Sequence, residues 1–145
     1  QFKKRIIHRN FYGVFFMVLN YLGHRHVYGQ MDCIELIRIF YKHELKLDFN
    51  LPAYTKSRQW MKDFSTEGVD KWASTYATKV NLTDARDYDV IAYKSNKSNL
   101  IIHFGIYLAP VRMLHIEEGG VSCVETLSDY WVEKIHTLYR HGSMV

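Results

Sequence analysis

Cys33, His103 and His115 are the residues of this 145-residue chain whose types and positions could together do chemistry. Cys33 follows Asp32 and opens an apolar run, and the unpaired amides at a helix start favour a thiolate. A thiol there, with a histidine base and a residue that orients the base, is the arrangement of a cysteine nucleophile. The backbone amides of Cys33 and Ile34 are candidates for an oxyanion hole. A hydrolase is therefore the first hypothesis, and a buried, inert cysteine is the alternative.

The two histidines fall in neighbouring runs that are predicted as strands. In the run His-Phe-Gly-Ile-Tyr-Leu that begins at His103, alternation puts the histidine on the same face as Gly105, which leaves room beside it. His115 follows twelve residues after His103, and a short turn at 109–112 would bring both side chains together on one face. His103 is then the predicted base for Cys33, and His115 the residue that fixes its ring.

Composition predicts one folded domain over residues 1–145. Apolar residues make up 48% of the chain and aromatic residues 15%, which is enough for a substantial core. The net charge of +4 permits attraction to anionic surfaces, but the basic residues are diffuse apart from Lys3-Lys4-Arg5. A nucleic-acid partner is not predicted, because no basic stripe alternates with an aromatic platform.

The cysteines and histidines near the thiol leave two further interpretations open. A single Cys33–Cys123 disulfide is one of them, although free thiols are favoured because the two surroundings differ. A metal site formed by Cys33 with His24 and His26 is the other. One thiol among histidines is a weak pattern for such a site, so we predict no metal and no cofactor.

The N-terminal segment has the layout of a signal peptide but lacks the cleavage site. Residues 1–22 begin with basic residues and continue into an apolar run, but no small-residue cleavage site follows. The run is about half the ~20 residues that a membrane span needs. We predict a buried first helix over about 9–23, ended by Gly23, and no transmembrane segment.

Along the chain, helices are predicted first and strands later. Apolar spacing predicts a helix over 33–46 that ends before Pro52, and one or two short helices within 55–80, broken near Gly68. Residues 128–141 are predicted as a short helix that passes into a last strand or continues as helix. Alternating runs predict antiparallel strands at 88–93, 100–108, 112–116 and 121–125. This order indicates an α+β domain.

The same motifs resemble a known family. Residues 28–37, Tyr-Gly-Gln-Met-Asp-Cys-Ile-Glu-Leu-Ile, are similar to the aromatic-Gly and Asp-Cys signature of the NlpC-type, papain-like cell-wall peptidases. The runs that begin at Asp89 and His103 resemble two of the family's strand motifs, and His115 stands at its third polar position. The ordered motifs cover nearly the whole chain. Residues 33–54 look most like the bacteriophage tail-assembly branch.

The resemblance implies a papain-like fold, with N-terminal helices packed on a small antiparallel sheet and the nucleophile at a helix start. It implies Cys33 as nucleophile, His103 as base and His115 as orienting residue, in cleavage of the peptide bonds of peptidoglycan stem peptides. Tyr28 and Asp32 match positions that flank the family's substrate cleft.

Two functional classes stay open. One is a phage-encoded cysteine endopeptidase of the virion tail tip, or of the host cytoplasm during assembly, that acts at the bacterial cell wall. The other is a structural tail-tip or tail-assembly protein on the same fold, with a weak or inactive site and other tail-tip proteins as partners. Ile34 and Glu35 replace the residues common beside the family's nucleophile, which keeps the second class open. Residues 55–87 are predicted as a helical insertion that serves docking.

Overall fold

The computed structural model describes residues 11–49, 51 and 64–145. The α-helices are α1 (Phe11–Leu19), α2 (Cys33–Phe40), α4 (Thr66–Ala73) and α5 (Asp129–Val132). Three short turns of other helix types are η1 (Tyr41–Leu45), η2 (Leu82–Asp84) and η3 (Gly142–Met144). The strands are β1 (Ala77–Val80), β2 (Val90–Lys94), β3 (Ile101–Leu108), β4 (Arg112–His115), β5 (Cys123–Thr126) and β6 (Ile135–His141).

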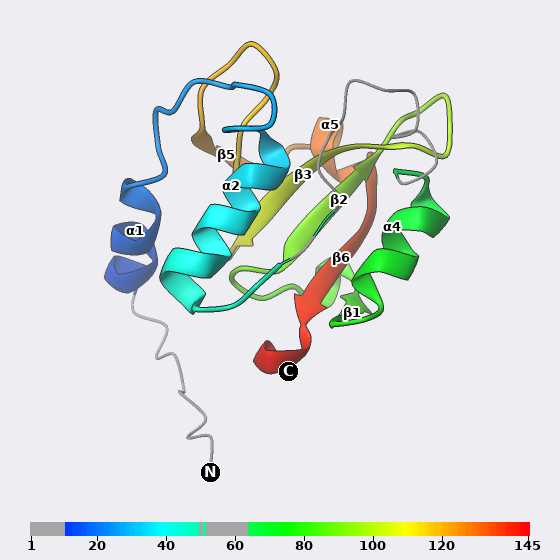
Figure 1. The fold of residues 1–145 in the computed structure, drawn as a ribbon, viewed down its shortest axis with the longest axis horizontal. Helices are drawn as coiled ribbons and strands as arrows, with labels where there is room; N and C mark the ends of the chain where they lie inside the picture. The colour runs from blue at the N-terminus through cyan, green and yellow to red at the C-terminus, as the bar shows by residue number, and fades with distance from the viewer. Residues whose placement is uncertain (1–10, 50, 52–63) are drawn as a thin grey trace.

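The strands form one antiparallel sheet in the order β1-β6-β2-β3-β4-β5. Strands β2 to β5 make a meander, because each pairs with the next along the chain. Strand β6 returns to pair with β2, and β1 pairs with β6 at the edge. Figure 1 shows α2 lying in front of β3, with β2 to its right. This is the α+β architecture that the sequence predicts, with helices first and the sheet after them.

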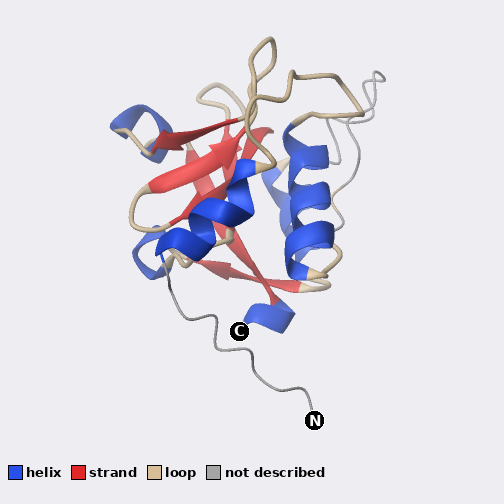
Figure 2. Ribbon diagram, turned by 90° about the vertical axis from the view of Figure 1, so that its left-hand side faces the viewer, coloured by secondary structure: helices blue, strands red, loops and turns tan. Residues whose placement is uncertain are grey.

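Both faces of the sheet are buried, each by different elements. On one face α1, α2 and α4 supply the main core, with Val18, Phe40 and Val69 among its residues. On the other face a smaller cluster gathers around Tyr93 of β2 and Trp131 of α5. The view in Figure 2 shows helices on both sides of the strands. Each fully buried side chain of this size contributes about 1.5–3 kcal/mol, so these two clusters hold the sheet in place.

The first helix is confirmed over its described length but is shorter than predicted. It is also not buried along its length, because Phe16 is 66% and Leu19 40% exposed while Val18 is buried. Helix α1 ends at Leu19, and the chain turns before Gly23, which takes a left-handed backbone with φ of 77°. The Gly23 N–H donates to the carbonyl of Ser122 at 2.8 Å, so it starts a loop rather than ending the helix. In the part of the chain that the structure describes, no helix is long and apolar enough to cross a membrane.

The second helix matches its predicted span closely. Helix α2 runs into the π-turn η1, which ends where Lys46 takes a left-handed backbone with φ of 55°. The N–H of Lys46 donates to the carbonyl of Tyr41, which closes the last turn. The chain therefore leaves the helical conformation at Lys46, before the predicted stop at Pro52, which lies outside the described residues.

The segment 55–87 needs two corrections in its described part. Helix α4 runs through Gly68 without a break, because the Gly68 N–H donates to the Ser65 hydroxyl in the first turn, where helix capping tolerates glycine. Residues 77–80 form the edge strand β1 and are not helical, so the segment is not a purely helical insertion. Pairing with β6 holds this strand at the sheet edge, and Thr78 and Val80 are of residue types that favour strands. Residues 55–63 lie outside the described residues.

The other strand predictions are confirmed with ends shifted by one or two residues. For 128–141 the first alternative holds, because the short helix α5 passes into β6. Tyr88, just before β2, takes an unfavourable left-handed backbone with φ of 77°. Its ring is 2% exposed and its N–H donates to the carbonyl of Tyr107 at 2.7 Å. Burial of the ring offsets the roughly 1–2 kcal/mol that this backbone costs.

Candidate active site

Asp32 caps the helix that begins at Cys33. One carboxylate oxygen of Asp32 accepts from the amides of Ile34 and Glu35 at 3.1 and 2.9 Å, and the other accepts from the Gly29 amide at 2.9 Å. The Asp32 residue is only 1% exposed. Three hydrogen bonds to one buried carboxylate fix the start of α2, and they set Cys33 at the end of the helix that carries positive potential.

This cap corrects two predicted roles. The carboxylate of Asp32 is buried and occupied by backbone amides, so it serves the helix start and not the substrate. The amide of Ile34 donates to Asp32, and the Ile34 side chain is fully buried in the core, so this residue does not offer an oxyanion-hole donor. Of the two predicted amides, the one of Cys33 is left as the candidate.

The loop before α2 is fastened to the connection between β4 and β5. The amide of Gly23 donates to the carbonyl of Ser122, and the amide of Ser122 donates to the carbonyl of His24, both at 2.8 Å. The amide of His26 donates to the carbonyl of Gly120 at 3.0 Å. Segments almost a hundred residues apart in the chain thus lie side by side, and the start of α2 is brought to the hairpin β4–β5.

Two aromatic side chains of this loop connect the thiol region with the first histidine. The rings of His26 and Tyr28 pack edge to face with centroids 4.9 Å apart. Partial burial and a hydrogen bond with Glu118 raise the pKa of Tyr28, and the nearby Cys33 adds to the effect. Burial lowers the pKa of His103, and the nearby His26 lowers it further. The loop is therefore close to both Cys33 and His103.

The two histidines are joined by a hydrogen bond. Nε2 of His103 lies 2.9 Å from Nδ1 of His115, and both residues are buried. The pairing of β3 with β4 brings Gly105 beside His115, since a Cβ on that glycine would lie 3.6 Å from the His115 Cβ. The predicted hairpin with both histidines on one face is confirmed, and the space that Gly105 leaves is filled by Met113, whose Sδ would lie 2.9 Å from a Cβ there.

Aromatic rings enclose the histidine pair on the second face of the sheet. The His103 ring stacks on its cross-strand partner Tyr93, with centroids 5.7 Å apart and planes at 27°. The ring of Trp131 lies 5.4 Å from His103 and 5.2 Å from His115, centroid to centroid. These contacts hold both imidazoles in one orientation and exclude water from them.

Burial keeps both imidazoles uncharged at neutral pH. It lowers the pKa of His103 to about 3, with smaller contributions from His115 and His26. It also lowers the pKa of His115, against the opposing influence of Glu125 and Glu117. An uncharged His103 has a free lone pair on one ring nitrogen, which is what a base needs. Nε2 is used by His115, so the nitrogen available to a thiol is Nδ1.

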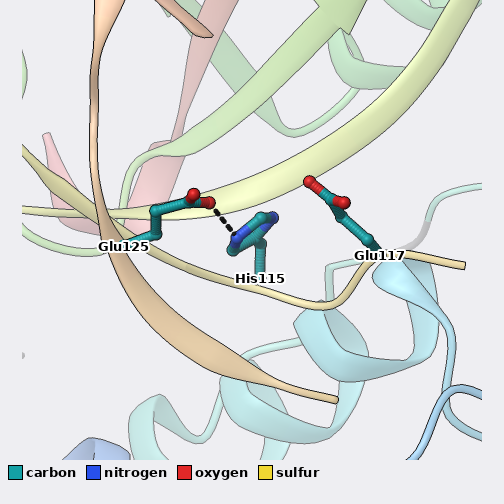
Figure 3. A group of neighbouring side chains, drawn as sticks. All are labelled: His115, Glu117 and Glu125. Carbon is teal, nitrogen blue, oxygen red and sulfur yellow. Dashed lines mark ion pairs between the residues drawn. The ribbon is translucent and has the colours of Figure 1, made fainter. Parts of the chain in front are cut away.

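Within the described ranges, one group of side chains has the composition of a metal site. Figure 3 shows His115 between Glu125 and Glu117, and their ligand atoms lie within 4.8 Å of one another. The Glu125 Oε2 atom is 2.7 Å from Nε2 of His115, so the carboxylate and the imidazole are in direct contact. His24 and His26 form no such group with Cys33 among these residues, and His24 Nε2 lies 2.8 Å from the carbonyl of Asn20.

Glu125 is the site residue that the sequence analysis misses. In the β4–β5 pairing, His115 lies opposite Cys123, and Met113 lies opposite Glu125. Residues two apart on a strand share a face, so Glu125 lies on the same face as His115. The alternation of Cys123 and Glu125 along the strand indicates that they share a face. It identifies Glu125 as a neighbour of His115 only when the register of β5 against β4 is known.

Neither Cys33 nor Cys123 forms a disulfide bond. Cys33 is 5% exposed and belongs to the main core on the side of α2. Cys123 is half-buried, and burial together with Glu125 and Glu117 raises its pKa. The open alternative of a Cys33–Cys123 disulfide is therefore not what the structure contains.

These features define the papain-like α+β class. Helices precede an antiparallel sheet, a cysteine is the first residue of a capped helix, and two histidines pair on adjacent strands. The model of the NlpC/P60 family matches residues 22–140, and the chain belongs to this family. Members of the family are typically cysteine peptidases.

Among curated proteins, the chain is 27% identical over 121 residues to the tail tip assembly protein K of Escherichia phage lambda. The match covers 82% of this chain but only 58% of that protein, so the chain spans little more than half the length of this relative.

Solved structures share the fold at low sequence identity. The NlpC/p60 domain of the peptidoglycan hydrolase SagA superposes with a TM-score of 0.60 at 16% identity, covering 90% of this chain and 98% of that one. A lipoprotein-like NLP/P60 protein of Staphylococcus aureus gives 0.61 at 21% identity over 88% of this chain and 40% of that one. RipD of Mycobacterium tuberculosis, described as non-catalytic and adapted to peptidoglycan binding, gives 0.56 at 18% identity over 87% and 92%.

Proposed function

We propose that this protein is a cysteine endopeptidase that cleaves peptide bonds in peptidoglycan stem peptides and forms part of a bacteriophage tail. The observation that carries the proposal is the buried, uncharged pair of His103 and His115, linked by the loop 23–32 to the helix that begins at Cys33. The tail tip assembly relative supports action at the host cell wall, from the virion tail tip or in the host during assembly. One domain over 1–145 fits this role, with no cofactor.

The proposed reaction has two steps. Cys33 Sγ attacks the scissile carbonyl carbon while its proton passes to Nδ1 of His103, and the Cys33 amide stabilises the oxyanion. The tetrahedral intermediate collapses to a thioester, and the amine leaves with the proton from His103. Water then attacks the thioester carbonyl, and His103 takes a proton from the water and returns it to the thiolate. The products are a carboxylic acid and an amine, and the enzyme is regenerated.

The two residues after Cys33, Ile34 and Glu35, differ from those common in the family, but their surroundings fit an active site. Glu35 brings a negative charge near the thiol, but its carboxylate lies 2.7 Å from a guanidinium nitrogen of Arg38, which offsets that charge. Ile34 is fully buried, so substrate recognition falls to the loop before α2. There Val27 is 44% exposed and Tyr28 is 55% exposed, which offers apolar and aromatic surface beside the thiol region.

The test compares Cys33→Ala with Cys123→Ala in digestion of purified peptidoglycan. Both variants remove one thiol, and Cys123 has no role in the proposed reaction. The wild-type protein and Cys123→Ala are expected to release new stem-peptide termini, detected by mass spectrometry of the soluble fragments. Cys33→Ala is expected to release none. Release by Cys33→Ala at the wild-type rate would refute the proposal.

A second candidate function is a structural tail-tip or tail-assembly role without hydrolysis, with other tail-tip proteins as partners. It is favoured by the non-catalytic description of RipD on the same fold. The same digestion separates the two. No release by any of the three proteins, with peptidoglycan or tail proteins still bound, would support the structural role.

A further inference from the structure

We propose that Glu125 is a fourth residue of the site, a positioning residue that fixes the hydrogen-bonding order of the two histidines. The inference rests on the proposed function, because the order matters for a base that serves Cys33. It comes from a contact outside the Cys–His–His set: Oε2 of Glu125 lies 2.7 Å from Nε2 of His115, and Nδ1 of the same ring lies 2.9 Å from Nε2 of His103.

The chemistry of the carboxylate selects one arrangement of hydrogens. An ionised carboxylate only accepts hydrogen bonds, so its approach to Nε2 of His115 is favourable when that nitrogen carries the hydrogen. A neutral imidazole has one N–H, which leaves Nδ1 of His115 as an acceptor. Nε2 of His103 must then be the donor in the 2.9 Å hydrogen bond, and Nδ1 of His103 keeps its lone pair. That is the nitrogen the thiol of Cys33 needs.

The opposite order would disable the base. If Nδ1 of His115 donated to His103, then Nε2 of His115 would present a lone pair to the Glu125 carboxylate at 2.7 Å, and two acceptors would face each other. His103 would then carry its hydrogen on Nδ1 and could not take a proton there. Without Glu125 nothing in this contact distinguishes the two orders.

The exposure of Glu125 suits a residue that acts through another. Its side chain is 45% exposed, while that of His115 is 2% exposed, so the carboxylate stands at the solvent end of a buried row. The Nε2–H direction is not aligned with Oε2 as a hydrogen bond requires, and rotation of the exposed side chain can bring the two into line. When His103 takes the thiol proton, the same carboxylate stabilises the positive charge on the histidine pair.

The first test reads the order of hydrogens directly. Nitrogen-detected NMR of histidine-labelled protein at pH 7 is expected to find the hydrogen of both His103 and His115 on Nε2. In Glu125→Met, which keeps the side-chain length and loses the acceptor, both rings should become mixtures of the two tautomers. Glu117→Gln is the matched control, because it also removes a charge near His115 but not the 2.7 Å contact. A wild-type His103 with its hydrogen on Nδ1, or no change in Glu125→Met, would overturn the inference.

The second test reads catalysis. Glu125→Gln, which keeps an acceptor without the charge, is expected to lower kcat about tenfold to a hundredfold with little change in KM, the range typical of carboxylates behind metal-ligating histidines. The acid limb of its pH–rate profile should move to lower pH, because Glu125 raises the pKa of His115. Glu125→Asp should recover part of the rate. An unshifted profile with wild-type kcat would count against a positioning role.

The two tests separate failure of this inference from failure of the proposed function. If the wild-type protein releases no peptides, the tautomer measurement still decides whether Glu125 orders the histidines. If release depends on Cys33 but neither tautomers nor profile respond to Glu125, the peptidase stands and the fourth residue falls.

Discussion

Two buried polar centres in the same sheet solve the burial of ionisable groups in opposite ways. At one end of β2 and β6, fully buried Asp89 binds Arg140 through two bonds, Nε to Oδ1 at 3.0 Å and a terminal nitrogen to Oδ2 at 2.7 Å. On β3 and β4, His103 and His115 are buried without charge and bind each other. The first centre keeps both charges and matches them; the second removes its charges by lowering two pKa values.

The difference separates a structural role from a chemical one. Asp89 also accepts from the Arg86 amide, and Arg140 also donates to the carbonyl of Asp84, so this pair is bonded on several sides. The hydrogen bonds of Arg140 with Asp89 raise the pKa of the Arg140 guanidinium, so this group stays charged. In the histidine pair, Nδ1 of His103 is not used by the partner ring. An atom left available in this way suits the proposed base, whereas both carboxylate oxygens of Asp89 already accept hydrogen bonds.

The largest expected effect comes from removing the base. His103→Gln should lower peptide release about ten-thousandfold, or about 5.5 kcal/mol in activation free energy, because Cys33 loses its proton acceptor. His136→Gln is the control, since His136 binds Asp70 away from the pair. Initial rates on purified peptidoglycan measure the effect, with circular dichroism to verify folding. Activity of His103→Gln within tenfold of wild type would show that the pair is not catalytic.

The structural centre should respond in stability instead. Asp89→Ala leaves Arg140 buried without its partner and should lower the free energy of unfolding by about 3–5 kcal/mol. Arg38→Ala, which breaks the exposed pair with Glu35, should change it by less than about 1 kcal/mol. Denaturant titrations give both values. Equal losses in the two variants would remove the distinction between buried and exposed pairs in this protein.

Acidification should destabilise the protein through the histidine centre. The folded-state pKa of His103, about 3, lies below its ordinary value of 6.5, so the unfolded chain binds more protons between these pH values and stability falls as pH drops through this window. His115 faces Glu117 and Glu125 and has a lowered pKa too, while His103 faces His26. His103 alone should cost about 2 kcal/mol between pH 7 and pH 5. Denaturant midpoints at the two pH values measure it, and a flat or rising stability would contradict the account.

Much of this arrangement is readable in the sequence because it depends on local patterns. The apolar stripe after Cys33 defines α2, and alternation with a short turn places His103 and His115 on one face of a hairpin. Family resemblance then supplies the fold, which the match over residues 22–140 establishes.

What the sequence does not reveal depends on register and on tertiary contacts. Glu125 becomes a neighbour of His115 only through the pairing of β4 with β5. Pairing with β6 holds the strand β1 at the sheet edge, and Gly68 stays helical because Ser65 caps its amide. The capping role of Asp32 is not evident in the sequence, since the same carboxylate can face a substrate or cap a helix and only its burial tells which.

The central claim is that Cys33, although buried, is the activated thiol of this chain. Iodoacetamide labelling at pH 7, followed by peptide mass spectrometry, measures it against Cys123 in the same molecule. Cys33 is 5% exposed and Cys123 is half-buried with a raised pKa, so accessibility alone predicts that Cys123 reacts faster. The account predicts that Cys33 reacts faster in the wild-type protein and loses that advantage in His103→Gln. Faster labelling of Cys123 in the wild type, or no effect of His103→Gln, would contradict it.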